Sequence, residues 1–287
     1  MKQMAVIMDG KALAQKIRLE EKEKVEKLNQ KGIYPKLAVI MVGEDKASKV
    51  YVKNKSKACT EVGISYEEFL LPENTTMEEL LQTIEMLNER EDVHGILLQS
   101  PIPKHLDILT AFESIDFRKD VDGFHPINIG RLALNRQTFI SCTPHGVMRL
   151  LEEYHVEVAG ANVVIVGRSN IVGKPLAQCM LNKDATVTIC HSKTKDLKEL
   201  TKKADIIVMA IGKANFLTAD MIKPNAVVID VGINRLDTGK LVGDVNFPEV
   251  SQKASYITPV PGGVGPMTIA MLIHNVVVAS KYLNGIE

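Results

Sequence analysis

Short runs of β-branched residues alternate with helical stretches along the second half of the chain. Four runs have the length and composition of buried strands, at 163–167, 185–190, 206–212 and 227–232. Stretches long enough for helical connections separate them, at 174–181, 197–203 and 218–222. Because two parallel strands joined through a helix form a right-handed crossover, this order predicts a doubly wound parallel sheet.

The first half repeats the alternation with different motifs. Strand-like runs lie at 37–43, 65–71 and 94–99, and helical stretches lie at 10–30, 46–62 and 77–90. We expect 119–135 to be mostly loop, 144–155 to be a connecting helix and 258–266 to be a loop rich in Pro and Gly. The chain is therefore expected to form two α/β domains flanking a cleft, 1–140 and 141–267, the first completed by an apolar helix at about 268–287.

The charge balance argues against two classes of partner. Lys and Arg number 35 and Asp and Glu number 35, so the formal net charge of the 287 residues is zero. A neutral chain has no global field to gather nucleic acid or an anionic membrane surface. We therefore expect neither partner, and we interpret the charged stretch within 10–30, whose signs alternate, as a solvated helix face.

The cysteines and the chain ends indicate a cytoplasmic protein. None of the four cysteines is spaced from another as a zinc ligand or a redox pair would be, namely Cys59, Cys142, Cys179 and Cys190. We expect them to be reduced, and we expect no bound metal. The first ten residues are too short an apolar stretch for a secretory signal, and 268–280 falls short of the ~20 residues that cross a bilayer.

A glycine turn follows the first strand of the second half. Gly167 ends the strand and Gly173 opens the helix after it, with Arg168 and Ser169 between them. Such glycines let the backbone turn tightly and approach a pyrophosphate at a helix N-terminus, which favours a Rossmann-type dinucleotide site. The middle glycine of the usual Gly-x-Gly-x-x-Gly motif is missing, so a purely structural turn remains an alternative.

The end of the next strand bears on the choice of dinucleotide. NAD sites carry a carboxylate there for the ribose 2′-hydroxyl, whereas this chain has no acidic residue until Asp196. Arg168, Ser192 and Lys193 can instead bind a 2′-phosphate. The sequence therefore favours NADP over NAD.

A second group of polar residues lies in the first half. Ser48, Tyr51 and Lys55 share one face of a predicted helix, Gln99 ends a buried strand, and Asp122 lies in an acidic loop. An amine held near an amide and away from bulk water can exchange protons near neutrality. A solvated lysine beside a half-buried tyrosine is the alternative interpretation of the helix face. We also expect Ser100–Pro101 or Val260–Pro261 to be cis, because tight proline turns often border ligand sites.

Several segments together resemble the bifunctional methylenetetrahydrofolate dehydrogenase/methenyltetrahydrofolate cyclohydrolase family. They occur in the order that is typical of the family and span nearly the whole chain, at 42–55, 99–103, 119–124, 167–169 and 259–268. One departure is Ser100, where the family usually has Leu before the first proline, a change that concerns the pocket wall more than the chemistry.

The resemblance implies roles for the residues of the first half. Lys55 would be the general acid/base of the cyclohydrolase step, and Gln99 would tune its charge and position. Tyr51 would stack on the aminobenzoate ring of the folate and help to orient Lys55, while Ser48 supports that helix face. Asp122 would anchor the pterin, and a carboxylate there can accept paired hydrogen bonds from its amino edge.

The resemblance also assigns residues of the second half. Those expected to bind the phosphates and ribose of NADP are Gly167, Arg168, Ser169, Gly173 and Ser192. Ile233 would lie against the nicotinamide, and Thr143 would border the same cleft. Pro261, Gly262 and Gly263 would also border it, the first two as substrate-binding residues. The family further implies a homodimer.

Two other functions remain open from the residues alone. One is a dehydrogenase of another small substrate that uses Tyr51 and Lys55 as short-chain dehydrogenases do. In those enzymes, however, the tyrosine and lysine follow the glycine turn, and here they precede it by over a hundred residues. The other is a non-catalytic NADP-binding module, which would not need Lys55, Gln99 and Asp122 together.

Overall fold

The computed structural model describes residues 4–286, which divide by their contacts into two compact units. The three-stranded unit comprises 15–142 and 269–286, and the six-stranded unit comprises 4–14 and 143–268. Both are α/β, and the mixed α/β class with a Rossmann-like parallel sheet is confirmed. The division differs from the expected one at the N-terminus, because 4–14 belong with the six-stranded unit.

The sheet of the three-stranded unit is entirely parallel, in the order β3-β2-β4. Its strands match the three expected ones, at β2 (Lys36–Val42), β3 (Ser65–Leu71) and β4 (Gly95–Leu98). Buried apolar residues of β2 and β4 pack against helices α3 and α4 on one face of the sheet. This unit contains helices α2 (Lys46–Val62), α3 (Met77–Glu89), α4 (Ile108–Ser114) and α5 (Pro126–Ala133).

Local capping fixes the ends of two of these helices. Asp45 precedes α2 and accepts a hydrogen bond from the Ser48 amide at 2.7 Å, while Gly63 ends α2 with a left-handed φ of 82°. Thr76 and Glu79 form a reciprocal capping box at the start of α3. The caps explain why the expected bounds of α2 are met and those of α3 are met to within one residue.

The segment 119–135, expected to be rich in loop, also contains a helix that the sequence did not predict, α5. Asp120 is 2% exposed and its carboxylate accepts hydrogen bonds from the backbone amides of Gly123, Phe124 and His125. It also accepts one from the Asn128 side chain at 2.8 Å. These bonds bend the chain into a helix start, where Pro126 occupies the first helical position.

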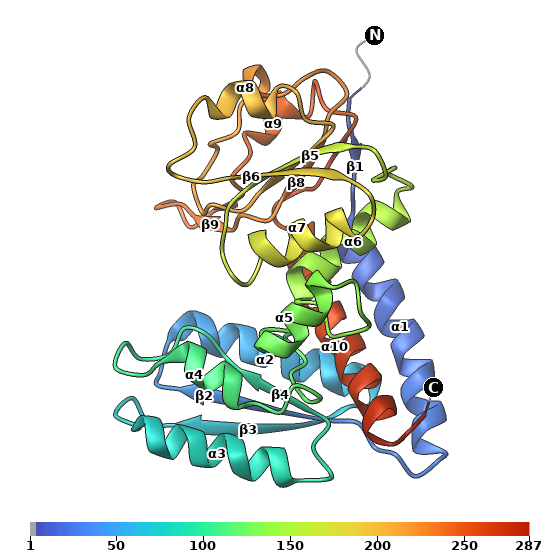
Figure 1. The fold of residues 1–287 in the computed structure, drawn as a ribbon, viewed down its shortest axis with the longest axis vertical. Helices are drawn as coiled ribbons and strands as arrows, with labels where there is room; N and C mark the ends of the chain where they lie inside the picture. The colour runs from blue at the N-terminus through green and yellow to red at the C-terminus, as the bar shows by residue number, and fades with distance from the viewer. Residues whose placement is uncertain (1–3, 287) are drawn as a thin grey trace. The chain divides into compact units, whose positions relative to one another are not determined.

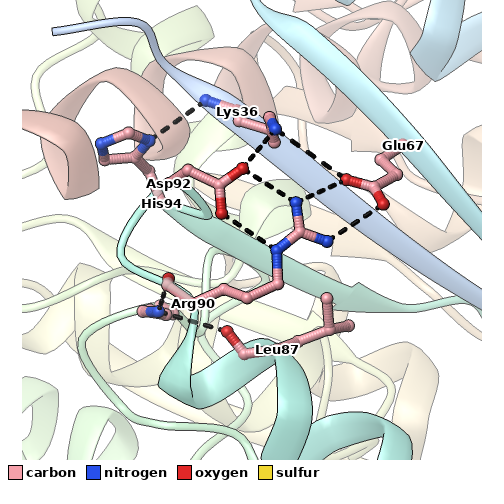
Figure 2. Close-up of polar contacts among 7 residues, drawn as sticks. Lys36, Glu67, Leu87, Arg90, Asp92 and His94 are labelled. Carbon is pink, nitrogen blue, oxygen red and sulfur yellow. Dashed lines mark hydrogen bonds and ion pairs between the residues drawn. The ribbon is translucent and has the colours of Figure 1, made fainter.

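A network of paired charges joins the strands at the amino end of this sheet (Figure 2). The guanidinium of Arg90 binds both oxygens of Glu67, at 3.0 and 2.9 Å, and both oxygens of Asp92, at 2.9 and 2.8 Å. Lys36, the first residue of β2, also pairs with Asp92, and its backbone amide donates to His94. The hydrogen bonds to Arg90 hold the pKa values of Glu67 and Asp92 below their usual range.

The six-stranded sheet has the order β1-β11-β8-β7-β5-β6 with parallel pairing throughout. The four expected strands are present as β5 (Asn162–Val166), β6 (Thr186–Cys190), β7 (Ile206–Met209) and β8 (Val227–Asp230). The sequence did not predict two short strands, β1 (Val6–Ile7) and β11 (Tyr256–Ile257), which extend the sheet beyond β8. β1 brings the N-terminal segment into this unit (Figure 1).

The remaining elements of the six-stranded unit are short. A hairpin pairs β9 (Asn234–Arg235) with β10 (Leu241–Val242). The helix expected at 218–222 is only a 3₁₀ turn, η1 (Ala219–Met221). The helices are α6 (Cys142–Glu153), α7 (Gly173–Leu181), α8 (Leu197–Thr201) and α9 (Phe247–Val250).

Two long helices complete the structure, α1 (Gly10–Asn29) and α10 (Val264–Leu283). Within the three-stranded unit they lie side by side (Figure 1), and His274 of α10 contacts Glu21 of α1 at 2.8 Å. With 20 residues, α10 extends beyond the apolar stretch at 268–280 and has the length and apolar composition of a membrane-spanning helix. Most of its positions are nevertheless buried in the protein, as in the core helix of a folded domain.

Candidate active site

Lys55 and Gln99 meet at the carboxyl end of the three-stranded sheet. The Lys55 ammonium on α2 donates to the Gln99 side-chain oxygen at 2.9 Å. The Gln99 amide nitrogen donates to the Ser100 carbonyl at 2.6 Å, which turns the amide oxygen toward the lysine. Gln99 is buried, whereas Lys55 is only half-buried. The pair therefore presents an oriented amine at a surface that a ligand can reach.

Ser48 and Tyr51 lie on the same helix as Lys55. The buried Ser48 hydroxyl donates to the Ser100 carbonyl at 3.4 Å, so Ser48 and Gln99 converge on the same oxygen. Tyr51 is 45% exposed, and its ring is available for stacking. The structure thus brings Ser48, Lys55 and Gln99 together as predicted and leaves Tyr51 beside them on the helix.

Asp122 is half-buried, whereas its neighbour Asp120 is buried. The Cys142 thiol donates a hydrogen bond to Oδ1 of Asp122, with the sulfur 3.7 Å from that oxygen. Burial raises the pKa of Asp122, the positive charge of Lys55 opposes the rise, and the negative charge of Asp120 adds to it. Asp122 therefore lies within the electrostatic reach of Lys55, and the two can act on one bound molecule.

Sequence reasoning missed two residues that support Asp122. The Asn275 side chain on α10 is buried and donates to the carbonyls of Val121, at 2.8 Å, and Ile140, at 3.1 Å. Cys142 donates through its thiol to the Val121 carbonyl at 3.4 Å. A polar Asn inside an otherwise apolar stretch was the available signal, but its partners lie over 130 positions away in the chain.

The glycine turn of the six-stranded unit admits no side chain at either glycine. A Cβ on Gly167, whose φ is 137°, would lie 2.3 Å from the Ala210 carbonyl oxygen. A Cβ on Gly173 would lie 2.1 Å from the Gly167 oxygen. The Ser169 hydroxyl accepts from the amides of Val172, at 3.1 Å, and Gly173, at 3.4 Å. Close packing between the strand end and the start of α7 is therefore built into this turn.

Arg168 and Ser192 occupy equivalent places on adjacent strands. Val166 of β5 pairs with Cys190 of β6, and each residue of interest lies two positions beyond its member of that pair. Both side chains are exposed at the carboxyl end of the sheet. The two can therefore contact a single phosphate group there.

Ile233, Pro261 and Gly262 line one cavity of about 120 Å³ in the six-stranded unit, between the segments 230–233 and 259–266. Both prolyl bonds expected as candidates are cis, Ser100–Pro101 and Val260–Pro261. Thr143 is not among the lining residues, and its hydroxyl bonds that of Thr268 at 3.0 Å. The predicted residues thus form a lysine-centred group in one unit and a glycine-centred group in the other.

The chain matches two family models, which cover most of its length. Residues 8–122 match the tetrahydrofolate dehydrogenase/cyclohydrolase catalytic domain, and residues 141–284 match the NAD(P)-binding domain of the same family. Among curated relatives, the bifunctional protein FolD of Campylobacter concisus is 58% identical over 275 residues, covering 96% of this chain and 97% of that protein. FolD of Bacillus cytotoxicus is 55% identical over 278 residues, covering 97% of both.

Solved structures agree with these relatives. The bifunctional FolD dehydrogenase/cyclohydrolase of Campylobacter jejuni has a TM-score of 0.96 and 54% identity, covering 97% of this chain and 99% of that one. FolD of Trypanosoma brucei, solved with NADP and an inhibitor, has a TM-score of 0.94 and 40% identity, covering 98% of each chain. On its sequence, its fold and its paired groups of site residues, this chain belongs to the tetrahydrofolate dehydrogenase/cyclohydrolase family.

Proposed function

We propose that this chain oxidises 5,10-methylenetetrahydrofolate to the methenyl form with NADP and then hydrolyses the methenyl form to 10-formyltetrahydrofolate. The contact between the Lys55 amine and the Gln99 amide, at 2.9 Å, is the observation that carries the proposal. Oxidation of the one-carbon bridge needs no protein base, because the nitrogen lone pairs of the folate stabilise the cation. Hydrolysis does need proton transfer, and Lys55 is the group that performs it.

In the hydrolysis, Lys55 alone can accept a proton and later return it. A water molecule adds to the methenyl carbon and gives a proton to Lys55. The bond from that carbon to N5 then breaks, N5 receives a proton from Lys55, and the second proton of the water goes to solvent. Gln99 keeps the amine in place through its oriented oxygen.

Asp122 anchors the pterin in this proposal. As a carboxylate, it accepts hydrogen bonds from the amino edge of the pterin and offsets the positive charge that develops on the substrate. Tyr51 is exposed and stacks on the aminobenzoate ring, while Ser48 supports the helix face through the Ser100 carbonyl. One bound folate then serves both reactions with the same amine beside it.

NADP fits the residues of the glycine turn. Gly167 and Gly173 leave no room for a Cβ, and the exposed Arg168 and Ser192 offer groups for a 2′-phosphate. The Ser169 hydroxyl accepts from the amides of Val172 and Gly173 within the same turn. Ile233 lines the cavity next to the 259–266 loop and borders the nicotinamide in this proposal. Thr143 bonds Thr268, two positions beyond that loop, and is proposed to border the same cleft. NADP supplies the hydride acceptor when bound. We propose a cytoplasmic location, which the four free cysteines support, and a homodimer, which so far only the resemblance to the family implies.

A direct assay tests the function. Purified protein is given 5,10-methylenetetrahydrofolate with NADP⁺ or NAD⁺, and methenyltetrahydrofolate is measured by its absorbance after acid quench. Hydrolysis is measured separately by adding methenyltetrahydrofolate without a dinucleotide. We expect both reactions and a preference for NADP⁺. Oxidation without any hydrolysis would reduce the proposal to a dehydrogenase, and activity in neither assay would refute it.

A further inference from the structure

A buried carboxylate organises two loops at the carboxyl ends of β7 and β8. Asp244 is 0% exposed. Its Oδ2 accepts from the backbone amides of Ile211, at 2.7 Å, and Gly212, at 3.0 Å. Its Oδ1 accepts from the Lys213 amide, at 2.8 Å, and from the Asn234 side chain, at 2.9 Å. One side chain thus joins the segment after β7 to the segment after β8.

A second buried carboxylate fixes Asp244 itself. Asp230, the last residue of β8, is 3% exposed and accepts from the backbone amides of Gly232, at 3.0 Å, Asp244, at 2.9 Å, and Val245, at 2.9 Å. A Cβ on Gly232 would lie 2.2 Å from the Asp244 carboxylate, so the two are in close contact. The arrangement leaves Asp244 little freedom to move.

The loops that Asp244 holds lie where ligands bind in doubly wound sheets. Such sheets bind nucleotides beyond the carboxyl ends of their strands. Gly232 and Ile233, which lie between Asp230 and Asn234, line the cavity of about 120 Å³ shared with 259–266. Asp244 is not among the lining residues, and its side chain faces the loops instead.

We propose that Asp244 is a positioning residue for the dinucleotide site, acting through the 211–213 and 232–234 loops. This inference rests on the proposed function only where it predicts a higher KM for NADP⁺ in the oxidation reaction. The predicted loss of NADP⁺ affinity does not depend on the folate activity. Four donors surround the two oxygens, so only a carboxylate matches them. An amide would turn its own N–H groups toward backbone donors.

The decisive variant is Asp244→Asn, with Asp205→Asn as its matched control. Asp205 also accepts a backbone amide, that of Asn162 at 2.7 Å, but it lies at the amino end of β7. We expect Asp244→Asn to raise the Kd of NADP⁺, measured by calorimetry, and its KM at least tenfold. Hydrolysis of methenyltetrahydrofolate, which needs no dinucleotide, should remain within twofold of wild type. Asp205→Asn should leave all three values within twofold.

The outcomes separate the inference from the proposed function. Unchanged NADP⁺ affinity in folded Asp244→Asn protein, or an equal loss of hydrolysis, would refute the positioning role. A wild type without folate activity whose NADP⁺ affinity still depends on Asp244 would refute the function and support the inference. If Asp244→Asn does not fold, Asn234→Ala, which removes one of the four donors, is measured in the same way. It should show the same selective loss to a smaller degree, and no selective loss would refute the inference.

Discussion

The two ends of the three-stranded sheet use charge in opposite ways. At the amino end, the cations Lys36 and Arg90 face the anions Glu67 and Asp92, so that each charge is matched by its neighbours. Pairing lowers the pKa of both carboxyl groups there. This end resembles the solvated, paired surface of an ordinary domain.

At the carboxyl end the groups are held but not neutralised. The Lys55 ammonium donates to an uncharged amide, and burial raises the pKa of Asp122. We infer that one sheet carries a network of paired charges at its amino end and the proposed chemistry at its carboxyl end. Charges that are already paired in the folded protein gain little interaction energy from a bound ligand. Lys55 and Asp122 can gain much more.

The largest effect is expected when the amine of Lys55 is removed. Lys55→Met should lower the rate of methenyltetrahydrofolate hydrolysis by about 10²-fold or more, the range typical of a lost general acid/base, while folate still binds. Lys53→Met, on another face of the same helix and exposed, is the matched control and should hydrolyse normally. Full hydrolysis by Lys55→Met would remove Lys55 from the mechanism.

A smaller effect is expected when the carboxylate loses its charge. Asp122→Asn should raise the Kd of the folate substrate about 10-fold to 100-fold, because a charge-assisted hydrogen bond is lost. The free energy of unfolding should stay the same or rise, since burial disfavours the charged form of Asp122 and the amide is neutral. Weaker binding together with a clear loss of stability would contradict this assignment.

A substitution in the charge network at the amino end of the three-stranded sheet should change only the free energy of unfolding. Arg90→Met should lower the free energy of unfolding by at most about 1 kcal/mol, because the paired side chains are 27 to 54% exposed and solvent screens them. Both enzymatic rates should be unchanged. Urea unfolding, with the exposed Arg136→Met as control, checks this prediction, and a change in kcat would show that the two ends are coupled.

The smallest expected effect is a pH dependence at His94. Burial lowers the pKa of this imidazole below 6.5, so the folded protein keeps it neutral. As pH falls below 6.5 the unfolded chain takes up a proton that the folded chain does not, and stability is lost. His94→Gln should therefore flatten the dependence of the unfolding free energy on pH as the pH falls below about 6.5. An identical pH profile in both proteins would count against the assignment.

Local patterns predicted most of the secondary structure and part of the site. The runs that became β2, β5 and β8 are apolar and bounded by turn residues, and such signals act over a few positions. The spacing of Ser48, Tyr51 and Lys55 predicted a shared face because helical geometry is local. Helix α5 was missed because the Asp120 side chain, and not a repeat in the sequence, starts it.

Local sequence patterns were enough to predict the alternation of strands and helices, the glycine turn at Gly167 and the helix face that carries Lys55. Three features became visible only in the folded protein: β1 joins the six-stranded sheet, Asn275 supports the loop of Asp122, and Asp244 binds the loop after β7. Residues far apart in the chain make these contacts. No short-range periodicity encodes such contacts, because they depend on where buried polar groups find partners after the chain has folded.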